Sequence, residues 1–168
     1  ARLSHVDDRG RVRMVDVTAK PETEREAVAE ARVRMSAAAV RAIRSRKVKK
    51  GDPLQTARLA GILAAKRTAD LIPLCHQLPL SYVDVDLHPM PRGYAIRARV
   101  GTHGRTGVEM EALVAVTVAA LTLYDMLKAV DRAMVIGPVS LIEKRGGRSG
   151  HYVLSLFEEL LQPLVVTL

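Results

Sequence analysis

The longest apolar pattern in the chain predicts a core helix over residues 106–131. Between residues 112 and 123 the side chains are apolar on every side of a helix except at two threonines, which is typical of a helix covered all round. Thr106 is expected to cap this helix, with Glu109 three residues on completing the capping box. The run is too short and too closely flanked by charge for a membrane span, which needs about 20 apolar residues.

Alternating apolar and polar positions predict strands elsewhere in the chain. A short strand is expected at residues 12–18. Residues 21–35 fit both a helix and a strand, and we favour the strand. Residues 80–87 and 94–100 alternate on either side of the turn signal PRG, which predicts an antiparallel hairpin. A last strand is expected at residues 134–144.

Two further helices are indicated by their end signals. Ser36 is expected to cap a short helix that runs to about Arg46, and the basic residues after it are expected to form a loop through Gly51. Asp52 followed by a proline predicts the start of the next helix, which the proline at position 73 ends. The order of elements predicts an α+β fold with helices packed on one face of an antiparallel sheet.

The length of 168 residues fits one domain. We interpret residues 1–11 as a mobile polar arm and residues 12–152 as the single folded domain. Residues 153–168 form an apolar tail that the pattern does not place.

The net charge of +8 points to an anionic partner. Nucleic acid is not favoured, because the chain has no Trp, one Phe and four Tyr and so lacks platforms on which bases stack, and no DNA-reading motif occurs. A lone Cys75 suits a reducing compartment. No signal or transit segment is seen, so we expect a cytoplasmic protein with no membrane partner.

Asp125 and Lys128 are three residues apart and share a face of the predicted helix. They form either a surface ion pair or a protonated lysine held by a carboxylate, ready to act as an acid. Glu109 is explained by the capping box, whereas Glu111 has no such role. His76 follows the second helix on an extended stretch and fits either a structural or a functional role.

The five histidines and the cysteine show no paired spacing of the kind zinc sites use, so no metal site is predicted. Basic side chains and glycines in KRGGRSG suit a loop that approaches an anion, although no Walker or dinucleotide motif is present. The candidate anion ligands are Lys49, Lys50, Lys66, Arg67, Lys144, Arg145 and Arg148. A solvated basic face is the ordinary alternative for such residues.

Four long motifs resemble the cyclic pyranopterin monophosphate synthase family, the C protein of molybdenum-cofactor biosynthesis. They are MVDVTAK, KKGDPLQTARLAGILAAKRTADLIPLCH, GRTGVEMEALVAVTVAALTLYDMLKAV and MVIGPVSLIEKRGGRSG. The resemblance implies an enzyme that converts 3′,8-cyclo-7,8-dihydroguanosine 5′-triphosphate to cyclic pyranopterin monophosphate and releases pyrophosphate. It also implies a ferredoxin-like α+β fold and a hexamer built as a trimer of dimers.

The same resemblance assigns roles to individual residues. Asp125 and Lys128 match the family's catalytic pair. The implied substrate-binding residues are Leu74, Cys75, His76, Met110, Glu111, Lys50 and Lys66, with Glu109, Arg67 and Lys144 as additional candidates. Glu111 and Asp125 lie far apart on one helix, so either the extended triphosphate spans the distance or two subunits share the site. We favour a site shared between subunits of a homo-oligomer.

The sequence requires no cofactor and leaves open whether Mg²⁺ accompanies the triphosphate. A different class of function remains as the alternative, namely a basic oligomeric module that binds RNA or a regulatory nucleotide without turnover.

Overall fold

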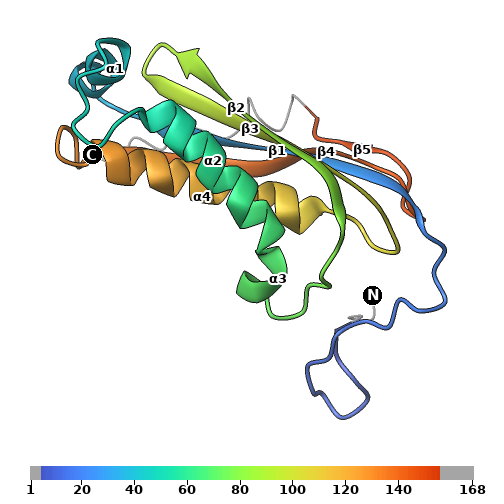
Figure 1. Cartoon of the computed structure of the whole chain (residues 1–168). Coiled ribbons are helices and arrows are strands. Elements are labelled where there is room, and N and C mark those ends of the chain that lie inside the picture. Colours follow the sequence, from blue (N-terminus) through green and yellow to red (C-terminus); the bar gives the residue numbers. More distant parts are fainter. Residues whose placement is uncertain (1–4, 156–168) are drawn as a thin grey trace.

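The computed structural model describes residues 5–155 of the chain (Figure 1). In this part of the chain the elements are β1 (Thr23–Arg34), α1 (Ala37–Arg44), α2 (Pro53–Lys66), α3 (Thr68–Leu71), β2 (Leu80–Met90), β3 (Gly93–Gly104), α4 (Glu109–Leu127), β4 (Val135–Arg145) and β5 (Tyr152–Val153). The strands form one antiparallel sheet in the order β2-β3-β1-β4-β5. Helices α2 and α4 cover one face of it, which confirms the predicted α+β fold.

Strand β1 lies in the middle of the sheet, between β3 and β4. Its Ala27, Ala29, Ala31 and Val33 are fully buried in the core beneath the helices. The polar residues between them point to the other face, as the period of two requires. The segment that fitted both a helix and a strand is therefore a strand, and the hairpin of β2 and β3 is also confirmed.

Helix α4 is the core helix, and α2 runs antiparallel to it at close range (Figure 1). A Cβ atom added at Gly61 of α2 would lie 2.9 Å from the backbone oxygen of Ala115, so only glycine allows this approach. By length and hydropathy α4 could cross a membrane, yet 56% of its most apolar window is buried inside the fold. The expected covering on all sides is incomplete, because Leu121 remains 54% exposed.

The predicted capping box is wrong. Helix α4 begins at Glu109, its N-cap is Val108, and no side chain bonds to the free backbone donors of its first turn. Thr106 lies two residues too early to cap that turn. The carboxylate of Glu109 instead pairs with Lys144 on β4 at 2.9 Å, a partner that no local sequence signal indicates.

The predicted strand at residues 12–18 is also wrong. Only Val12 makes a bridge, to Val6, and the residues after it have no regular structure. The alternation has another cause, since the partly buried Val15 and Val17 face a pocket instead of a sheet.

The predicted starts of α1 and α2 are confirmed. The Ser36 hydroxyl accepts a hydrogen bond from the Ala39 amide, and the Asp52 carboxylate accepts two at the start of α2. The second helix breaks at Arg67 into α2 and α3 before ending where proline predicted. Mobility of the arm at residues 1–11 stays a prediction, and its first four residues lie outside the described part. Of the apolar tail, residues 156–168 lie outside it too.

Candidate functional site

Three charged side chains meet at the C-terminal end of α4, and we call them the lysine–aspartate cluster: Lys50, Asp125 and Lys128. The Nζ of Lys128 lies 2.8 Å from Oδ1 of Asp125, and the Nζ of Lys50 lies 2.9 Å from Oδ2. Lys50 also donates to the backbone oxygen of Asp125 at 3.1 Å. The loop of residues 46–51, far from α4 in the sequence, thus supplies one member of the cluster.

The two lysines fix the charge state of the carboxylate between them. Hydrogen bonds from Lys128 and then Lys50 lower the pKa of Asp125 to about 2, so this acid is ionised at neutral pH. The carbonyl groups at the C-terminal end of a helix favour nearby cations, which suits both lysines. The cluster carries two positive charges and one negative charge, and its side chains are half-exposed. It can therefore receive an anion from solvent.

A pocket of about 420 Å³ lies at the other end of α4, and we call it the N-terminal pocket. It brings together the predicted residues of the LCH and EME motifs with part of the N-terminal segment. Its lining is His5, Val15, Val17, Lys20, Leu74, Cys75, His76, Leu78, Thr106, Gly107, Glu109, Met110 and Glu111.

Glu111 is the buried acid of this pocket, with 4% of its surface exposed. Burial raises its pKa to about 7, and the nearby charge of Glu109 adds to the rise. The thiol of Cys75 also has a raised pKa, first because it is partly buried and then because Glu111 is close. An acid with a pKa near neutral pH can both give and take a proton, which suits general acid–base chemistry.

The glycine-rich connection after β4 lies near the same end. Lys144 is held by Glu109 at 2.9 Å, so its charge is already paired. Lys66 and Arg67, at the exposed C-terminal end of α2, do not line the N-terminal pocket. The structure therefore groups most of the predicted residues into two sets. Lys66 and Arg67 lie outside both, and Lys144 is connected to the N-terminal pocket only through its pair with Glu109.

Sequence reasoning missed the contribution of the N-terminal segment. Val15, Val17 and Lys20 line the N-terminal pocket, and Asp16 lies close enough to His76 for their charges to interact. The pKa of Asp16 is lowered mainly by hydrogen bonds from Thr18. A signal was present, because these residues belong to the motif MVDVTAK, which was used for the resemblance but given no role.

The two sets of residues lie at opposite ends of α4. Glu111 and Asp125 are 14 residues apart (125 minus 111) on a continuous helix, which at 1.5 Å per residue separates their backbones by about 21 Å. Among residues 5–155, no three His, Cys, Asp or Glu side chains are grouped as they would be to hold a metal ion.

Comparison with known proteins places the chain in one family. The model of the MoaC family matches residues 14–147. A cyclic pyranopterin monophosphate synthase of Thermomicrobium roseum is 59% identical over 152 residues, which cover 89% of this chain and 92% of that protein. Proteins of the same name from Heliobacterium modesticaldum and Nostoc sp. are each 56% identical, over 90% of this chain and 96% and 92% of theirs. The chain therefore belongs to the MoaC family.

Proposed function

We propose that the chain is a cyclic pyranopterin monophosphate synthase, a lyase of molybdenum-cofactor biosynthesis. The substrate is 3′,8-cyclo-7,8-dihydroguanosine 5′-triphosphate, and the products are cyclic pyranopterin monophosphate and pyrophosphate. Family membership supports the activity. The lysine–aspartate cluster is the observation that carries the assignment of the catalytic residues.

Lys128 is the acid of the proposed reaction. Its ammonium group is held by Asp125 at 2.8 Å, which fixes the position from which it can give a proton to a reacting group. Lys50 adds a second positive charge on the other oxygen of the same carboxylate. Together the lysines stabilise the negative charge that develops on departing pyrophosphate.

The N-terminal pocket supplies groups for the ring of the substrate. Glu111, whose pKa is about 7, is a proton donor and acceptor, and His76 lines the same pocket. The polar and apolar side chains around them form a concave site large enough for a small molecule.

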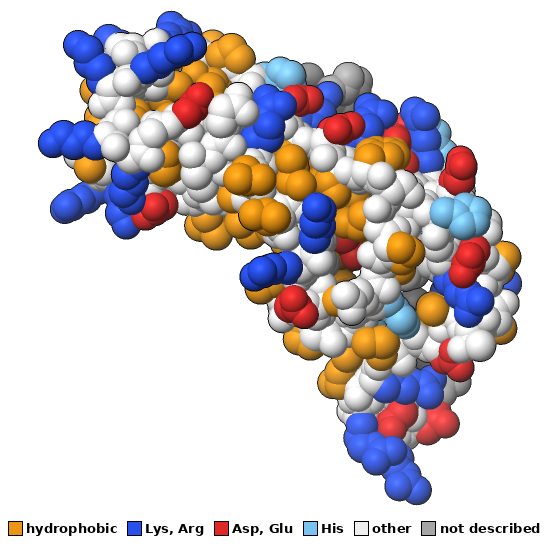
Figure 2. All heavy atoms as spheres, viewed as in Figure 1, with side chains coloured by type: hydrophobic (Ala, Val, Ile, Leu, Met, Phe, Trp, Pro, Cys, Tyr) orange, Lys and Arg blue, Asp and Glu red, His pale blue; other side chains and the backbone are white. Residues whose placement is uncertain are grey.

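We propose that one active site combines the lysine–aspartate cluster of one subunit with the N-terminal pocket of another. The separation of about 21 Å along α4 supports this arrangement, because no single reacting atom can touch both ends. The outer sides of α2 and α4 also expose Leu59, Leu63 and Leu121 to 57%, 50% and 54%. Figure 2 shows hydrophobic side chains gathered over these helices, as expected of a surface that a second copy covers. The proposed assembly is a hexamer, a trimer of dimers.

The direct test is pyrophosphate release from the cyclic dihydroguanosine triphosphate by the purified protein. Turnover by the wild-type chain and its loss in Lys128→Ala are the expected results. The assay is run with and without EDTA, since Mg²⁺ commonly accompanies a triphosphate. Tight binding of the substrate without pyrophosphate release would instead support the alternative, a module that binds a nucleotide or RNA without turnover.

A further inference from the structure

A second concave surface lies at the α1 end of the molecule, and we call it the arginine groove. It has a volume of about 550 Å³, and its charged lining residues are Arg34, Arg41, Arg44, Arg92 and Asp131. None of Lys50, Asp125 and Lys128 lines it, and neither does any residue of the N-terminal pocket. The groove therefore shares no lining residue with either part of the proposed active site.

Three segments are joined to form this groove, so its shape belongs to the fold. The Met35 amide donates to the backbone oxygen of Arg92 at 3.0 Å, which ties the β2–β3 turn to the corner between β1 and α1. The Ser36 amide donates to Oδ2 of Asp131 at 2.8 Å, which ties the segment after α4 to the start of α1. The three walls are held against one another by backbone donors.

The charge of the groove is positive and uncompensated. It contains four guanidinium groups and one carboxylate, a balance of +3. Asp131 accepts hydrogen bonds from the Ser36 and Ala133 amides, and these bonds lower its pKa, so its charge is directed at the backbone. Arg41 and Arg44 are three residues apart on α1 and repel each other across one helix face.

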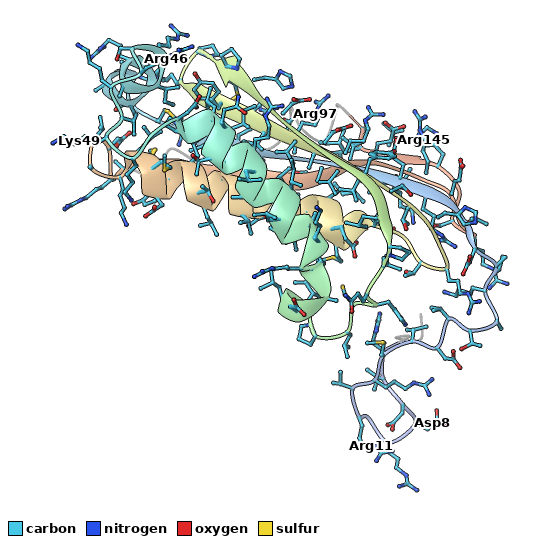
Figure 3. The ribbon with its side chains drawn as sticks, viewed as in Figure 1. Asp8, Arg11, Arg46, Lys49, Arg97 and Arg145 are labelled. Atoms are coloured by element: carbon cyan, nitrogen blue, oxygen red, sulfur yellow. The ribbon has the colours of Figure 1, made fainter. Side chains whose placement is uncertain are left out.

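None of the four groove arginines, Arg34, Arg41, Arg44 and Arg92, pairs with a carboxylate of residues 5–155. Arginines on the sheet behave differently, since Arg97 pairs with Glu30 at 2.7 Å and Arg145 with Glu143 at 2.6 Å. Figure 3 labels both, and Figure 2 shows Lys and Arg side chains gathered at the α1 end. A cluster of guanidinium groups without counter-charges matches a ligand with several negative oxygens.

We propose that the arginine groove binds a small molecule that carries a di- or triphosphate. The guanidinium groups hold the phosphate oxygens through paired donors. Met35, Val40 and Pro91 give the groove an apolar floor for the organic part of such a molecule. The volume lies within the range of small-molecule sites. A single-stranded nucleic acid fits less well, because no aromatic side chain lines the groove. The proposal does not depend on the activity proposed above.

Calorimetric titration tests the proposal in a background that removes the catalytic lysines, Lys50→Ala with Lys128→Ala. Inorganic triphosphate and GTP are titrated separately, so that recognition of phosphate alone is distinguished from recognition of a nucleotide. Adding Arg41→Gln and Arg44→Gln is expected to weaken binding about tenfold or more, because each guanidinium contributes charged hydrogen bonds. If inorganic triphosphate and GTP bind with equal affinity, the groove recognises the phosphates alone. If GTP binds more tightly, the apolar residues of the groove also contact the organic part of the ligand. Either result supports the proposal.

A matched control removes two positive charges elsewhere, by Arg9→Gln and Arg11→Gln in the N-terminal segment. Figure 3 places Arg11 at the opposite end of the molecule from Arg46, which follows α1. The control is expected to bind as its parent does, and circular dichroism checks that each variant is folded. The proposal would be overturned if neither triphosphate binds to the Lys50→Ala, Lys128→Ala parent. It would also be overturned if the Arg9 and Arg11 substitutions weaken binding as much as the Arg41 and Arg44 substitutions do. Binding of a short RNA without binding of either triphosphate would also overturn it, in favour of a nucleic-acid surface.

Discussion

The two ends of α4 carry carboxylates in opposite electrostatic states. At the C-terminal end, Asp125 is half-exposed between two ammonium groups, and its pKa is about 2. At the N-terminal end, Glu111 is buried, forms no ion pair with any of residues 5–155, and has a pKa of about 7. One helix thus presents a permanent anion at one end and an acid that titrates near neutral pH at the other. Solvation and ion pairing, and not residue type, decide which acid is available for proton transfer.

The largest expected effect is at the C-terminal end, in Lys128→Ala. Turnover should fall by about two to four decades, the usual contribution of a general acid, while the fold is retained because Lys128 is half-exposed. Pyrophosphate release and thermal unfolding measure the two quantities. Asp125→Asn should behave in the same way, since the amide keeps the shape but cannot hold the ammonium group. Wild-type turnover in a folded Lys128→Ala protein would reduce the cluster to a surface ion pair.

The N-terminal end is tested by the pH dependence of stability. Between pH 4.5 and about 7 the folded chain binds the Glu111 proton more tightly than the unfolded chain does, so the free energy of unfolding falls as pH rises. One pKa unit is worth about 1.4 kcal/mol, so Glu111 should contribute a fall of about 3 kcal/mol across this window. Glu111→Gln should lack this contribution. Chemical denaturation of both proteins from pH 4 to 8 measures it, and parallel curves would show that Glu111 titrates normally.

Asp125 has the opposite sign. Because its pKa is lowered, its contribution to stability is present above its ordinary value of 3.8 and is lost as pH falls toward about 2. The two ends of α4 therefore change stability in different pH ranges: Asp125 below pH 3.8, and Glu111 between pH 4.5 and about 7.

A smaller effect is expected at the loop of residues 46–51, which supplies Lys50 to the lysine–aspartate cluster. Lys50→Ala should weaken pyrophosphate binding by about tenfold and reduce its dependence on salt, because one cation near the anion is removed. Lys49→Ala is the matched control, since none of the described residues forms an ion pair with Lys49. Calorimetry over a salt series distinguishes the two lysines. Identical behaviour of both variants would mean that Lys50 acts only through overall charge.

The smallest effect concerns the end of α1 that leads into this loop. Arg46 has a φ of 55°, the left-handed conformation that glycine adopts most easily. The Lys47 amide donates to the Ala42 oxygen at 3.1 Å, so the helix ends in the tight turn usually closed by glycine. Arg46→Gly should raise the free energy of unfolding by about 1 kcal/mol, because it removes a left-handed strain of about 1–2 kcal/mol and the chain entropy of glycine offsets only part of that gain. Arg46→Ala keeps the strain and should give no such gain, and equal stability of both variants would contradict this explanation.

Much of the fold could be predicted because its signals are local. The apolar run identified α4, Ser36 and Asp52 identified the starts of α1 and α2, and the turn between two alternating segments identified the β2–β3 hairpin. Strand β1 was ambiguous because its glutamates and alanines favour a helix, and because residues 27–31 are all buried, which weakens the alternation by which a strand is recognised.

The site could be predicted only in part. The resemblance named Lys50, Asp125 and Glu111, but no periodicity predicts that Lys50 reaches across 75 residues of sequence to Asp125. The local signals around the N-terminal pocket misled in two places. The alternation at residues 12–18 was interpreted as a strand, although it arises because Val15 and Val17 face the N-terminal pocket. Glu109 was assigned to a helix cap, although it pairs with Lys144.

The claim that the two ends of α4 meet across a subunit interface is tested most directly by mixing two inactive proteins, Glu111→Gln and Asp125→Asn. If each site takes Asp125 from one chain and Glu111 from another, random reassembly of equal amounts leaves about one site in four with both residues intact. Activity should therefore return to about a quarter of the wild-type level, with mass spectrometry confirming that mixed assemblies have formed. Mixed assemblies without any recovered activity would contradict the account and place both residues in a site within one chain.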